Sequence, residues 1–478
     1  MAAKSVIAID LGAESGRVIQ AAFDGKEIRL EELHRFSNVP VSVCGTLFWD
    51  VLRLWYDIRT GIEKIKGAAS IGVDTWGVDF GLLDEQGHLL GNPVHYRDDR
   101  TKRMMEWVFE RVPRREVFER TGIQFMSLNS LYQIASLVAS KSPQLSLAKT
   151  FLTMPDLINY WLTGTIACEF TNATTTQMFN PRKQNWDTEM LAKLGIPTAI
   201  FPEVIPPGTQ LGDYNGIPVT APACHDTGSA VVAVPATTPN YAYISSGTWS
   251  CIGLEVEQPV IDDASYAANL TNEGGAFGTL RLLKNVMGMW LVQQCRETWR
   301  KKGDDYTYSE LAELASAAEP FRSFIDPDDP SFFSPGNMPN RIRAFCERTA
   351  QPMPTSVGQL MRTIYESLAL KYRFCLEQLM TVSGRKVDII HIVGGGANNK
   401  LLNQMTANAT GRVVIAGPIE ATATGNALLQ FITLGELADI KQARNLLNRS
   451  SGMVRFEPSY TSAWKSVYEF FQTIIAHN

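Results

Sequence analysis

Two short loops of small and hydroxyl-bearing residues could bind phosphate. One reads Asp-Leu-Gly-Ala-Glu-Ser-Gly-Arg over Asp10–Arg17, and the other reads Ser-Ser-Gly-Thr-Trp-Ser over Ser245–Ser250. Small residues let backbone N–H groups approach a phosphate closely, and successive N–H groups in a turn form an anion-binding nest. Ser15 and Thr248 could add hydroxyl donors. Either loop alone could be an ordinary hairpin or Ser/Thr turn, but their corresponding positions in the two halves favour phosphate binding.

Asp10 and Asp226 are the carboxylates whose settings suit phosphoryl transfer. Asp10 follows a short apolar run and could hold a hydrated Mg²⁺, because this ion prefers carboxylates and keeps several of its waters. Asp226 lies in the sequence His-Asp-Thr-Gly over His225–Gly228 and could accept a hydroxyl proton. The same pattern is typical of a helix N-cap, which these residues alone favour, and both roles can hold at once.

Three further motifs could contact a sugar or a nucleotide. Asp74–Asp79 and Tyr96–Arg100 combine Trp76 with acidic residues that could bind a polyol, although a buried Trp beside a solvated acidic turn is favoured on these residues alone. His391–Asn398 reads as a strand that ends in three glycines, against which a nucleotide ring could lie. The sequence contains neither a Gly-x-Gly-x-x-Gly motif after a strand nor a P-loop pattern, so we expect neither a dinucleotide site nor a P-loop enzyme.

In the first half of the chain, the sequence patterns of the elements that must position these residues indicate a mixed sheet rather than a Rossmann domain. Short β-branched runs and period-two alternation indicate strands, and apolar residues at helical spacing indicate a helix. The expected strands are 6–9, 18–23, 27–34 and 70–73, the expected helix is 48–66, and the expected hairpin is 80–90. Residues 95–215 are expected to be mostly helix and loop, with a Pro/Gly-rich linker at 202–216.

The second half repeats the layout of a strand, a Gly/Ser turn and a departing strand, which indicates two related lobes. This half opens at 218–221, and the expected strands are 241–244, 251–256, 387–393 and 413–416. The expected helices are 357–382, 401–409 and 421–434.

Composition excludes several classes of protein. The chain of 478 residues has 44 Lys and Arg against 49 Asp and Glu, a net charge of −5, so no broad basic field would attract nucleic acid or anionic lipid. The seven scattered cysteines are typical of reduced thiols in a cytosolic protein, and no paired histidine motif predicts zinc. No apolar run is long enough to span a membrane, and the N-terminus does not resemble a signal peptide, so we expect a cytoplasmic protein.

In combination, the motifs resemble the FGGY family of carbohydrate kinases over essentially the whole chain. The blocks that carry the resemblance, in order, are 8–18, 72–80, 96–98, 170–177, 225–227, 245–250, 272–275, 283–288 and 391–396. The resemblance implies an α/β fold of two RNase H-like, actin-type ATPase lobes with a nucleotide and sugar cleft between them. We place the N-terminal lobe, with the sugar-binding side and the first phosphate loop, at 1–215. The C-terminal lobe, with the catalytic Asp, the second phosphate loop and the adenosine site, is placed at 216–478.

Within that family the chain is similar to kinases of L-rhamnulose. The resemblance implies transfer of the γ-phosphate of MgATP to the 1-hydroxyl of L-rhamnulose, with Asp226 as the base that takes the hydroxyl proton. It thus favours catalysis over a simple cap. The implied substrate-binding residues are Gly77, His225, Asp226, Thr227 and Asn285. The implied ATP-binding residues are Ala13, Glu14, Ser15, Gly16, Arg17, Thr248, Gln293 and Gly395, and Asp10 would hold Mg²⁺ through water.

One residue departs from the family pattern, and other functions remain open. Many sugar kinases have Ser or Thr at the position of Glu14, and a carboxylate beside the γ-phosphate would be repulsive, so we expect Glu14 to point away. The alternatives are another ketose kinase, such as an L-fuculokinase or L-xylulokinase, and a non-kinase actin-like ATPase or sugar sensor. We expect a monomer without nucleic-acid or membrane partners.

Overall fold

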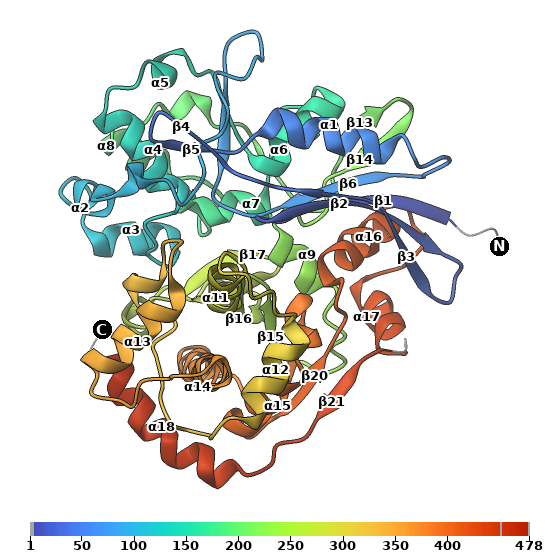
Figure 1. Ribbon diagram of the computed structural model, residues 1–478. Helices are drawn as coiled ribbons and strands as arrows, with labels where there is room; N and C mark the ends of the chain where they lie inside the picture. Colours follow the sequence, from blue (N-terminus) through green and yellow to red (C-terminus); the bar gives the residue numbers. More distant parts are fainter. Residues whose placement is uncertain (1–3, 450–451, 477–478) are drawn as a thin grey trace. The chain divides into compact units, whose positions relative to one another are not determined.

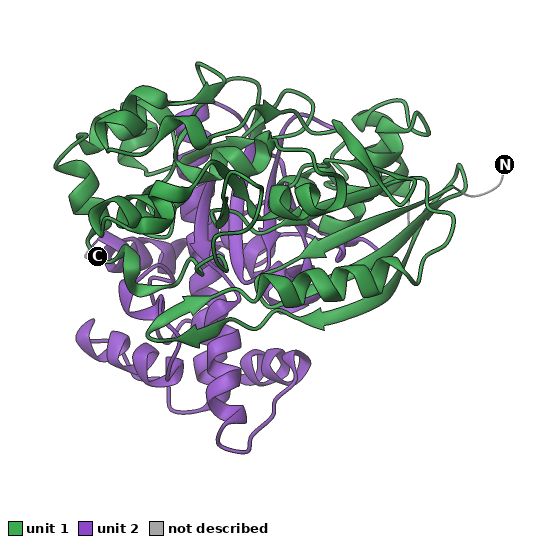
Figure 2. Cartoon of the chain, turned by 90° about the horizontal axis from the view of Figure 1, so that it is seen from above, with its two compact units in different colours: residues 1–237, 255–282, 421–450 green, residues 238–254, 283–420, 451–478 purple. Residues whose placement is uncertain are grey.

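The computed structural model describes residues 4–449 and 452–476, which pack into two compact units (Figure 2). Unit 1 is drawn from residues 1–237, 255–282 and 421–450, and unit 2 from residues 238–254, 283–420 and 451–478. The expected contiguous segments 1–215 and 216–478 do not coincide with these units. The reason is that segments after residue 215, among them α9 (Asp226–Val232) and α16 (Ala421–Thr433), pack on the sheet of unit 1. The functions assigned to the two lobes stay predictions.

A mixed sheet forms the centre of unit 1. In the described residues it has six strands in the order β13-β14-β6-β1-β2-β3. The bounds are β1 (Lys4–Leu11), β2 (Ser15–Phe23), β3 (Ile28–Ser37), β6 (Ile71–Thr75), β13 (Gln210–Tyr214) and β14 (Ile217–Thr220). β1, β2 and β3 are antiparallel to one another, whereas β6 runs parallel to β1 and β14 parallel to β6. The expectation of a mixed sheet is confirmed.

Helices cover both faces of this sheet. α1 (Val51–Ile62) and α6 (Met154–Thr163) lie on one face, and α16 and α9 lie on the other (Figure 1). α1 begins where the side chain of Asp50 accepts a hydrogen bond from the backbone N–H of Arg53 at 3.3 Å. Because apolar helices cover β1 on both faces, its residues from Val6 to Leu11 are all buried.

Two segments of unit 1 pair differently from the expectation. The stretch 202–216 is not a linker: it contains β12 (Val204–Ile205) and β13, and β13 forms a hairpin with β14 about Asn215 and Gly216. Asn-Gly is a hairpin-turn signal that the Pro/Gly-rich composition obscured. The segment 80–90 does turn back on itself as expected, with Leu83 bridged to Leu89 and the N–H of Leu90 donating to the carbonyl of Leu82 at 2.9 Å. The pairing of β7 (Phe80–Leu83) with the distant β8 (Thr150–Thr153) was not expected.

Unit 2 repeats the core of unit 1, which confirms the expectation of two related halves. β15 (Tyr241–Ser246) and β16 (Trp249–Val256) form an antiparallel hairpin, as β1 and β2 do. β19 (Ile389–Val393) runs parallel to β15, as β6 does to β1. β20 (Val413–Ala416) continues the parallel order, and β21 (Val454–Phe456) closes it antiparallel.

The helix expected at 357–382 is α14 (Val357–Ser383). Ser356 caps its first turn by accepting from the N–H of Gln359 at 3.2 Å. Gly384 ends it in the left-handed conformation, with φ of 67°.

The remaining elements include β17 and β18, which belong to the same sheet as β15, β16 and β19. In unit 1 they are α2 (Met104–Phe109), α3 (Arg114–Thr121), α4 (Ser130–Ala139), α5 (Pro143–Leu147), α7 (Phe170–Ala173), α8 (Thr188–Lys193), α10 (Asp263–Ala267), α17 (Ile440–Arg449), β4 (Val41–Val43), β5 (Thr46–Phe48), β9 (Cys168–Glu169), β10 (Phe179–Asn180), β11 (Asn185–Trp186) and β17 (Thr271–Gly274). In unit 2 they are α11 (Trp290–Arg300), α12 (Tyr308–Ala317), α13 (Met338–Arg348), α15 (Lys400–Thr410) and α18 (Thr461–Ala476). β18 (Leu280–Met287) begins in unit 1 and continues in unit 2.

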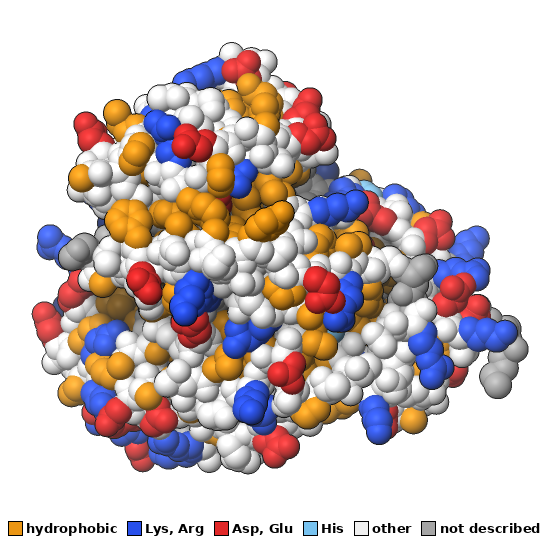
Figure 3. Space-filling view, turned by 90° about the horizontal axis from the view of Figure 1, so that it is seen from below, with side chains coloured by type: hydrophobic (Ala, Val, Ile, Leu, Met, Phe, Trp, Pro, Cys, Tyr) orange, Lys and Arg blue, Asp and Glu red, His pale blue; other side chains and the backbone are white. Residues whose placement is uncertain are grey.

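The surface carries charges of both signs. On the face drawn in Figure 3, Lys and Arg side chains are interspersed with Asp and Glu. This face therefore shows no single-sign field in its described side chains of the kind that attracts nucleic-acid phosphates. No helix within residues 4–449 and 452–476 is both long and apolar enough to cross a membrane.

Gly425 lets α16 pack directly on α9. A Cβ at Gly425 would lie 1.8 Å from the backbone oxygen of Ser229. We expect Gly425→Ala to lower the free energy of unfolding by about 1–3 kcal/mol, as overpacking does, although Ala is the better helix former by about 1 kcal/mol. Urea denaturation measures this loss. Gly395→Ala is the control, because its Cβ would meet no atom within 4 Å, and equal losses in both variants would contradict the packing argument.

Candidate active site

Two acidic residues meet where the first strands of unit 1 end. Because β1 and β6 are parallel and in register, Asp10 lies directly beside Asp74. Arg17, on the antiparallel strand β2, stands opposite Asp10 and forms an ion pair with it. The sequence therefore folds the expected metal-binding carboxylate and one expected ATP-binding residue into direct contact.

The segment before α9 brings Asp226 to the same edge of the sheet. The backbone N–H of Thr75 donates to the carbonyl of Cys224 at 2.9 Å, and Thr75 forms a parallel bridge with His225. Asp226 is the first residue of α9, and His225 is its N-cap residue. The cap interpretation of Asp226 is therefore wrong by one position, although its carboxylate accepts from the N–H of Thr227 at 2.5 Å.

The carboxyl of Asp226 has the electrostatic setting of a base. Burial, and then the charge of Asp10, raises its pKa to about 7, while Thr227 and Arg281 act in the opposite direction. Its side chain is still 31% exposed, so the carboxylate reaches the surface of the unit. Burial and the neighbouring Asp10 also raise the pKa of Asp74, against the hydrogen bond from Asn426. A pKa near neutrality is what a general base at pH 7 requires.

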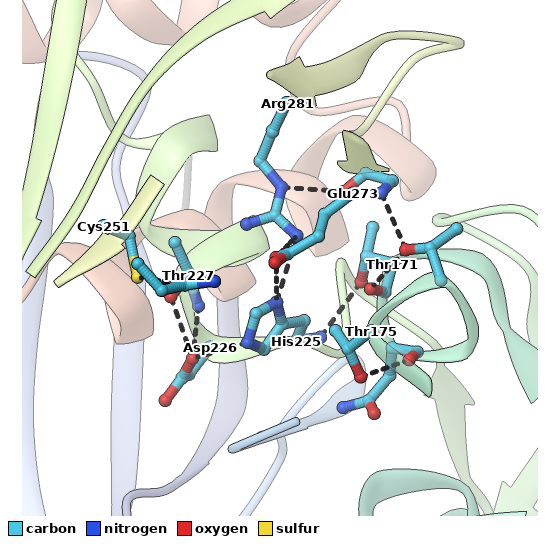
Figure 4. A network of polar contacts seen from close by, with 12 residues as sticks. Thr171, Thr175, His225, Asp226, Thr227, Cys251, Glu273 and Arg281 are labelled. Atoms are coloured by element: carbon cyan, nitrogen blue, oxygen red, sulfur yellow. Dashed lines mark hydrogen bonds and ion pairs between the residues drawn. The ribbon is translucent and has the colours of Figure 1, made fainter. Parts of the chain in front are cut away.

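His225 connects Asp226 to a buried ion pair (Figure 4). Its Nε2 lies 3.3 Å from Oδ1 of Asp226, and its Nδ1 lies 3.0 Å from Nη2 of Arg281. Glu273 on β17 lies 3.3 Å from the same Nη2 of Arg281 and 3.5 Å from Nδ1 of His225. Burial, and then the charge of Arg281, holds the pKa of His225 well below its ordinary value, so the ring is neutral at pH 7.

A second buried acid holds the backbone in front of Asp226. Glu169 accepts from the N–H of Cys224 at 3.0 Å and from the hydroxyl of Thr171 at 2.6 Å. Thr171 in turn accepts from the N–H of His225 at 3.0 Å. Burial raises the pKa of Glu169 to about 8. These contacts supply acceptors to a segment of chain with almost no sheet partner of its own.

The loop with Gly77 is built around a buried carboxylate. Asp79 is fully buried and accepts from the indole N–H groups of Trp49 at 2.5 Å and Trp76 at 3.0 Å. Trp76 is buried as expected, but the expectation of a solvated acidic turn beside it is wrong. Burial raises the pKa of Asp79 to about 6. A Cβ at Gly77 would lie 3.0 Å from Oγ1 of Thr175, so a side chain there would crowd the loop.

The first predicted phosphate loop is the turn between β1 and β2. The N–H of Gly12 donates to the carbonyl of Ser15 at 2.9 Å, and Asn38 holds the turn by donating to the carbonyls of Gly12 at 2.9 Å and Glu14 at 3.0 Å. Glu14 is exposed. Contact of Ala13, Ser15 and Gly16 with a nucleotide stays a prediction, as does the orientation of Glu14 toward or away from it.

In unit 2, three residues predicted to bind ATP lie at one end of the sheet. Thr248 is in the turn between β15 and β16, and Gln293 on α11 donates to its hydroxyl at 3.3 Å. Gly395 follows the end of β19, whose Val393 pairs with Ser245 of the same turn region. Asn285 on β18 accepts a hydrogen bond from the thiol of Cys251 at 3.0 Å.

The residues around Asp10 fit a hydrated Mg²⁺ better than a metal held directly by the chain. No group of three or more His, Cys, Asp or Glu in the described residues is arranged to ligate a metal. Asp74 nevertheless has a buried Oδ1, beside Asp10, that has no hydrogen-bond partner within the described part of the chain. An ion that keeps its waters and binds through one or two carboxylates suits this arrangement.

Sequence reasoning missed the groups that surround Asp226. Glu273 and Arg281 lie far from His225 in sequence, and only the block 272–275 gave a signal, without a role. Glu169 and Thr171 had no motif of their own apart from the Thr-rich run that contains Thr171. These residues could be recognised as buried groups beside a short irregular segment only once the fold was known.

Solved structures of sugar kinases share this fold over almost the whole chain. A ligand-bound xylulose kinase from Lactobacillus acidophilus has a TM-score of 0.80 at 16% identity, covering 98% of this chain and 97% of its own. A glycerol kinase from Plasmodium falciparum with ADP has a TM-score of 0.77 at 16% identity, covering 99% and 98%. The fold is thus the two-domain fold of actin-like ATPases, which confirms the expected fold class.

The sequence then identifies the family. Residues 5–223 match the N-terminal domain of the FGGY family of carbohydrate kinases, and residues 242–434 match its C-terminal domain. The chain belongs to the FGGY family of carbohydrate kinases and is an ATP-dependent sugar kinase. It is 44% identical to a rhamnulokinase from Bacteroides thetaiotaomicron over 99% of both chains. It is 41% identical to a rhamnulokinase from an Enterobacter species over 96% of this chain and 95% of that one.

The raised pKa of Asp226 predicts a pH-dependent cost in stability. The unfolded carboxyl loses its proton near pH 4, whereas the folded one keeps it to about pH 7, so stability falls as pH rises through this window. We expect Asp226→Asn to be more stable than wild type at pH 8, by about 1 kcal/mol or more, with a smaller gain at pH 4. Thermal unfolding at several pH values measures the difference.

Asp57→Asn provides the contrast for this measurement. Asp57 is buried in α1 and paired with Arg53 at 2.8 Å, so its substitution should destabilise the protein at pH 8. A gain for both variants, or a gain for Asp226→Asn that is independent of pH, would contradict the raised pKa.

Proposed function

We propose that the protein transfers the γ-phosphoryl group of ATP to the 1-hydroxyl of L-rhamnulose. The support for the sugar is identity of 40–44% over nearly the full chain with proteins named rhamnulokinase. The observation that carries the chemistry is Asp226, a partly exposed carboxylate with a pKa near 7 at the start of a helix.

In the proposed reaction, the oxygen of the sugar hydroxyl forms a bond to the γ-phosphorus of ATP. The bond from that phosphorus to the bridging oxygen breaks, and its electron pair leaves with ADP. Asp226 accepts the hydroxyl proton as the nucleophile forms its bond. Phosphoryl transfer depends mainly on positioning and charge neutralisation, so the remaining residues act by binding.

We propose that the residues expected from the family resemblance bind the two substrates. Gly77, His225, Thr227 and Asn285 would contact the ketose. The turn Ala13–Arg17 and residues Thr248, Gln293 and Gly395 would contact ATP. The N–H groups of such turns suit phosphate oxygens, and a glycine at the end of a strand allows a flat ring to approach the backbone.

Asp10 would hold Mg²⁺ through its water molecules. When bound, the ion would supply positive charge that neutralises the phosphates. Asp10 already pairs with Arg17, so a bound cation and the guanidinium would share one carboxylate. Cytoplasmic location and a monomeric state stay predictions.

The choice of sugar is tested by ADP release with MgATP and a panel of L-rhamnulose, L-fuculose, L-xylulose, D-xylulose, glycerol and L-rhamnose. We expect L-rhamnulose to give the highest kcat/KM, with the aldose L-rhamnose inactive as an acceptor. A higher kcat/KM for another ketose or for glycerol would overturn the assignment of L-rhamnulose. Release of ADP that no sugar stimulates would favour an actin-like ATPase without kinase activity.

The base is tested by Asp226→Asn. We expect kcat to fall by about 10²–10⁴-fold, the usual contribution of a general base, with a smaller change in the KM for the sugar. Asp57→Asn, which removes a buried carboxylate of α1, should keep kcat within a few fold. A kcat of Asp226→Asn close to that of wild type would exclude Asp226 as the base.

A further inference from the structure

A buried polar chain in unit 1 ends at Asp226 (Figure 4). It begins at Arg281, whose side chain is fully buried at the start of β18. Its Nε donates to the carbonyl of Gly274 at 2.7 Å, and its Nη2 lies 3.3 Å from Oε2 of Glu273. A guanidinium is planar and rigid, so these two contacts fix the direction of Nη2 toward His225.

The contact between Arg281 and His225 determines which ring nitrogen carries the proton. Arginine has only donors, so Nδ1 of His225, 3.0 Å from Nη2 of Arg281, must accept. Glu273 is the competing partner of Nδ1, but at the longer distance of 3.5 Å. If Nδ1 carried a proton, two donors would face each other at 3.0 Å. In the neutral ring the proton therefore lies on Nε2.

The proton on Nε2 faces one oxygen of Asp226. Nε2 lies 3.3 Å from Oδ1, and the N–H and hydroxyl of Thr227 approach the same Oδ1 at 2.5 and 3.2 Å. Thr227 donates two hydrogen bonds to Oδ1, and Nε2 of His225 lies beside the same oxygen. The other oxygen, Oδ2, has no hydrogen bond to the residues that the structure describes.

We propose that Arg281 and Glu273 are positioning residues that fix His225 as its Nε2–H tautomer, so that the two oxygens of Asp226 become unequal. Oδ1 is held by donors, and Oδ2 is the oxygen that accepts the proton of the sugar hydroxyl. This inference rests on the proposed function for the role of Asp226 as a base. Glu273 balances the buried charge of Arg281, which would otherwise be costly to bury.

Other charged groups lie near His225 and Asp226 and contribute to the pH dependence expected of kcat/KM. Asp10 raises the pKa of Asp226, and Arg281 lowers it. Burial, and then the charges of Asp10 and Asp226, raise the pKa of Asp74. Loss of the charge of Arg281 is therefore expected to move the acidic limb of the kcat/KM profile to higher pH.

The tautomer can be measured in the wild-type protein without any substitution in the chain of contacts. The two nitrogens of a neutral imidazole differ strongly in ¹⁵N chemical shift according to which one carries the proton. A ¹⁵N-histidine-labelled sample contains six histidines. The signal that disappears in His225→Gln is assigned to His225. We expect the Nε2–H tautomer, and an Nδ1–H tautomer would overturn the inference.

Kinetics test whether the tautomer matters. We expect the double variant Arg281→Met/Glu273→Leu, which removes both buried charges together, to lower kcat by about 10–100-fold, as loss of an orienting partner does. The KM for the sugar should change less, and the acidic limb should move to higher pH. In a His225→Phe background the same pair of substitutions should change kcat by less than about 3-fold, because their effect passes through His225.

Two further variants separate positioning from folding. Arg281→Lys keeps the charge and one donor and should recover part of the lost kcat. Arg120→Gln breaks another ion pair of unit 1, to the buried Asp187 at 3.1 Å, and should lower stability without moving the pH profile. Equal kcat losses with and without His225, or a pH profile identical to that of wild type, would overturn the inference.

These outcomes are distinct from failure of the proposed function. A wild-type protein without sugar-dependent ADP release would overturn the kinase assignment and the role of Oδ2 with it. An Nδ1–H tautomer in an active enzyme would overturn the positioning inference alone.

Discussion

Unit 1 depends on holding the carboxylates of Asp10, Asp74 and Asp226 at one edge of a buried sheet. Like charges in a region of low dielectric repel one another strongly, so each needs a compensating group. Arg17 pairs with Asp10, the N–H of Thr227 donates to Asp226, and Asn426 donates to Asp74 at 2.6 Å. Asn426 reaches Asp74 only because Gly72 leaves room: a Cβ there would lie 2.5 Å from the amide oxygen of Asn426. A packing detail of α16 thus follows from an electrostatic requirement.

The same requirement explains why unit 1 is not a continuous stretch of sequence. Asn426 comes from the segment 421–450, and Glu273 and Arg281 come from the segment 255–282. The segment 421–450 returns to the sheet whose first strand carries Asp10, because α16 packs on β1 and β6. β17 of the segment 255–282 packs instead beside α7 and belongs, with β18, to the other sheet. The donors and the positive charge that stabilise the acidic edge are therefore supplied by distant parts of the chain, and the expected boundary at residue 215 could not reveal this.

Local sequence patterns predicted the parts of the fold that depend on near neighbours. The alternation in β2 and β3, the apolar spacing of α1 and the Gly-rich end of β19 are each visible within a few residues, and Thr248 and Gln293 do meet in unit 2. Contacts between distant segments were not predictable in this way. The pairing of β7 with β8, the burial of Asp79 against Trp49 and the contact of Arg281 with His225 each depend on where two remote segments meet.

The backbone that carries Asp226 is held mainly by side chains rather than by a sheet. Between β14 and α9 the backbone pairs first at Ala221, with Gly208 and Thr209, and then beside Thr75, through Cys224 and His225. Glu169 and Thr171 supply the missing acceptors for the N–H groups of Cys224 and His225. Burying Glu169 raises its pKa to about 8. An irregular segment fixed by such groups can place a carboxylate beyond the end of a sheet, where a regular strand would keep both its N–H and C=O groups in the ladder. The site thus gains an acid of near-neutral pKa on a rigid support without extending the sheet itself.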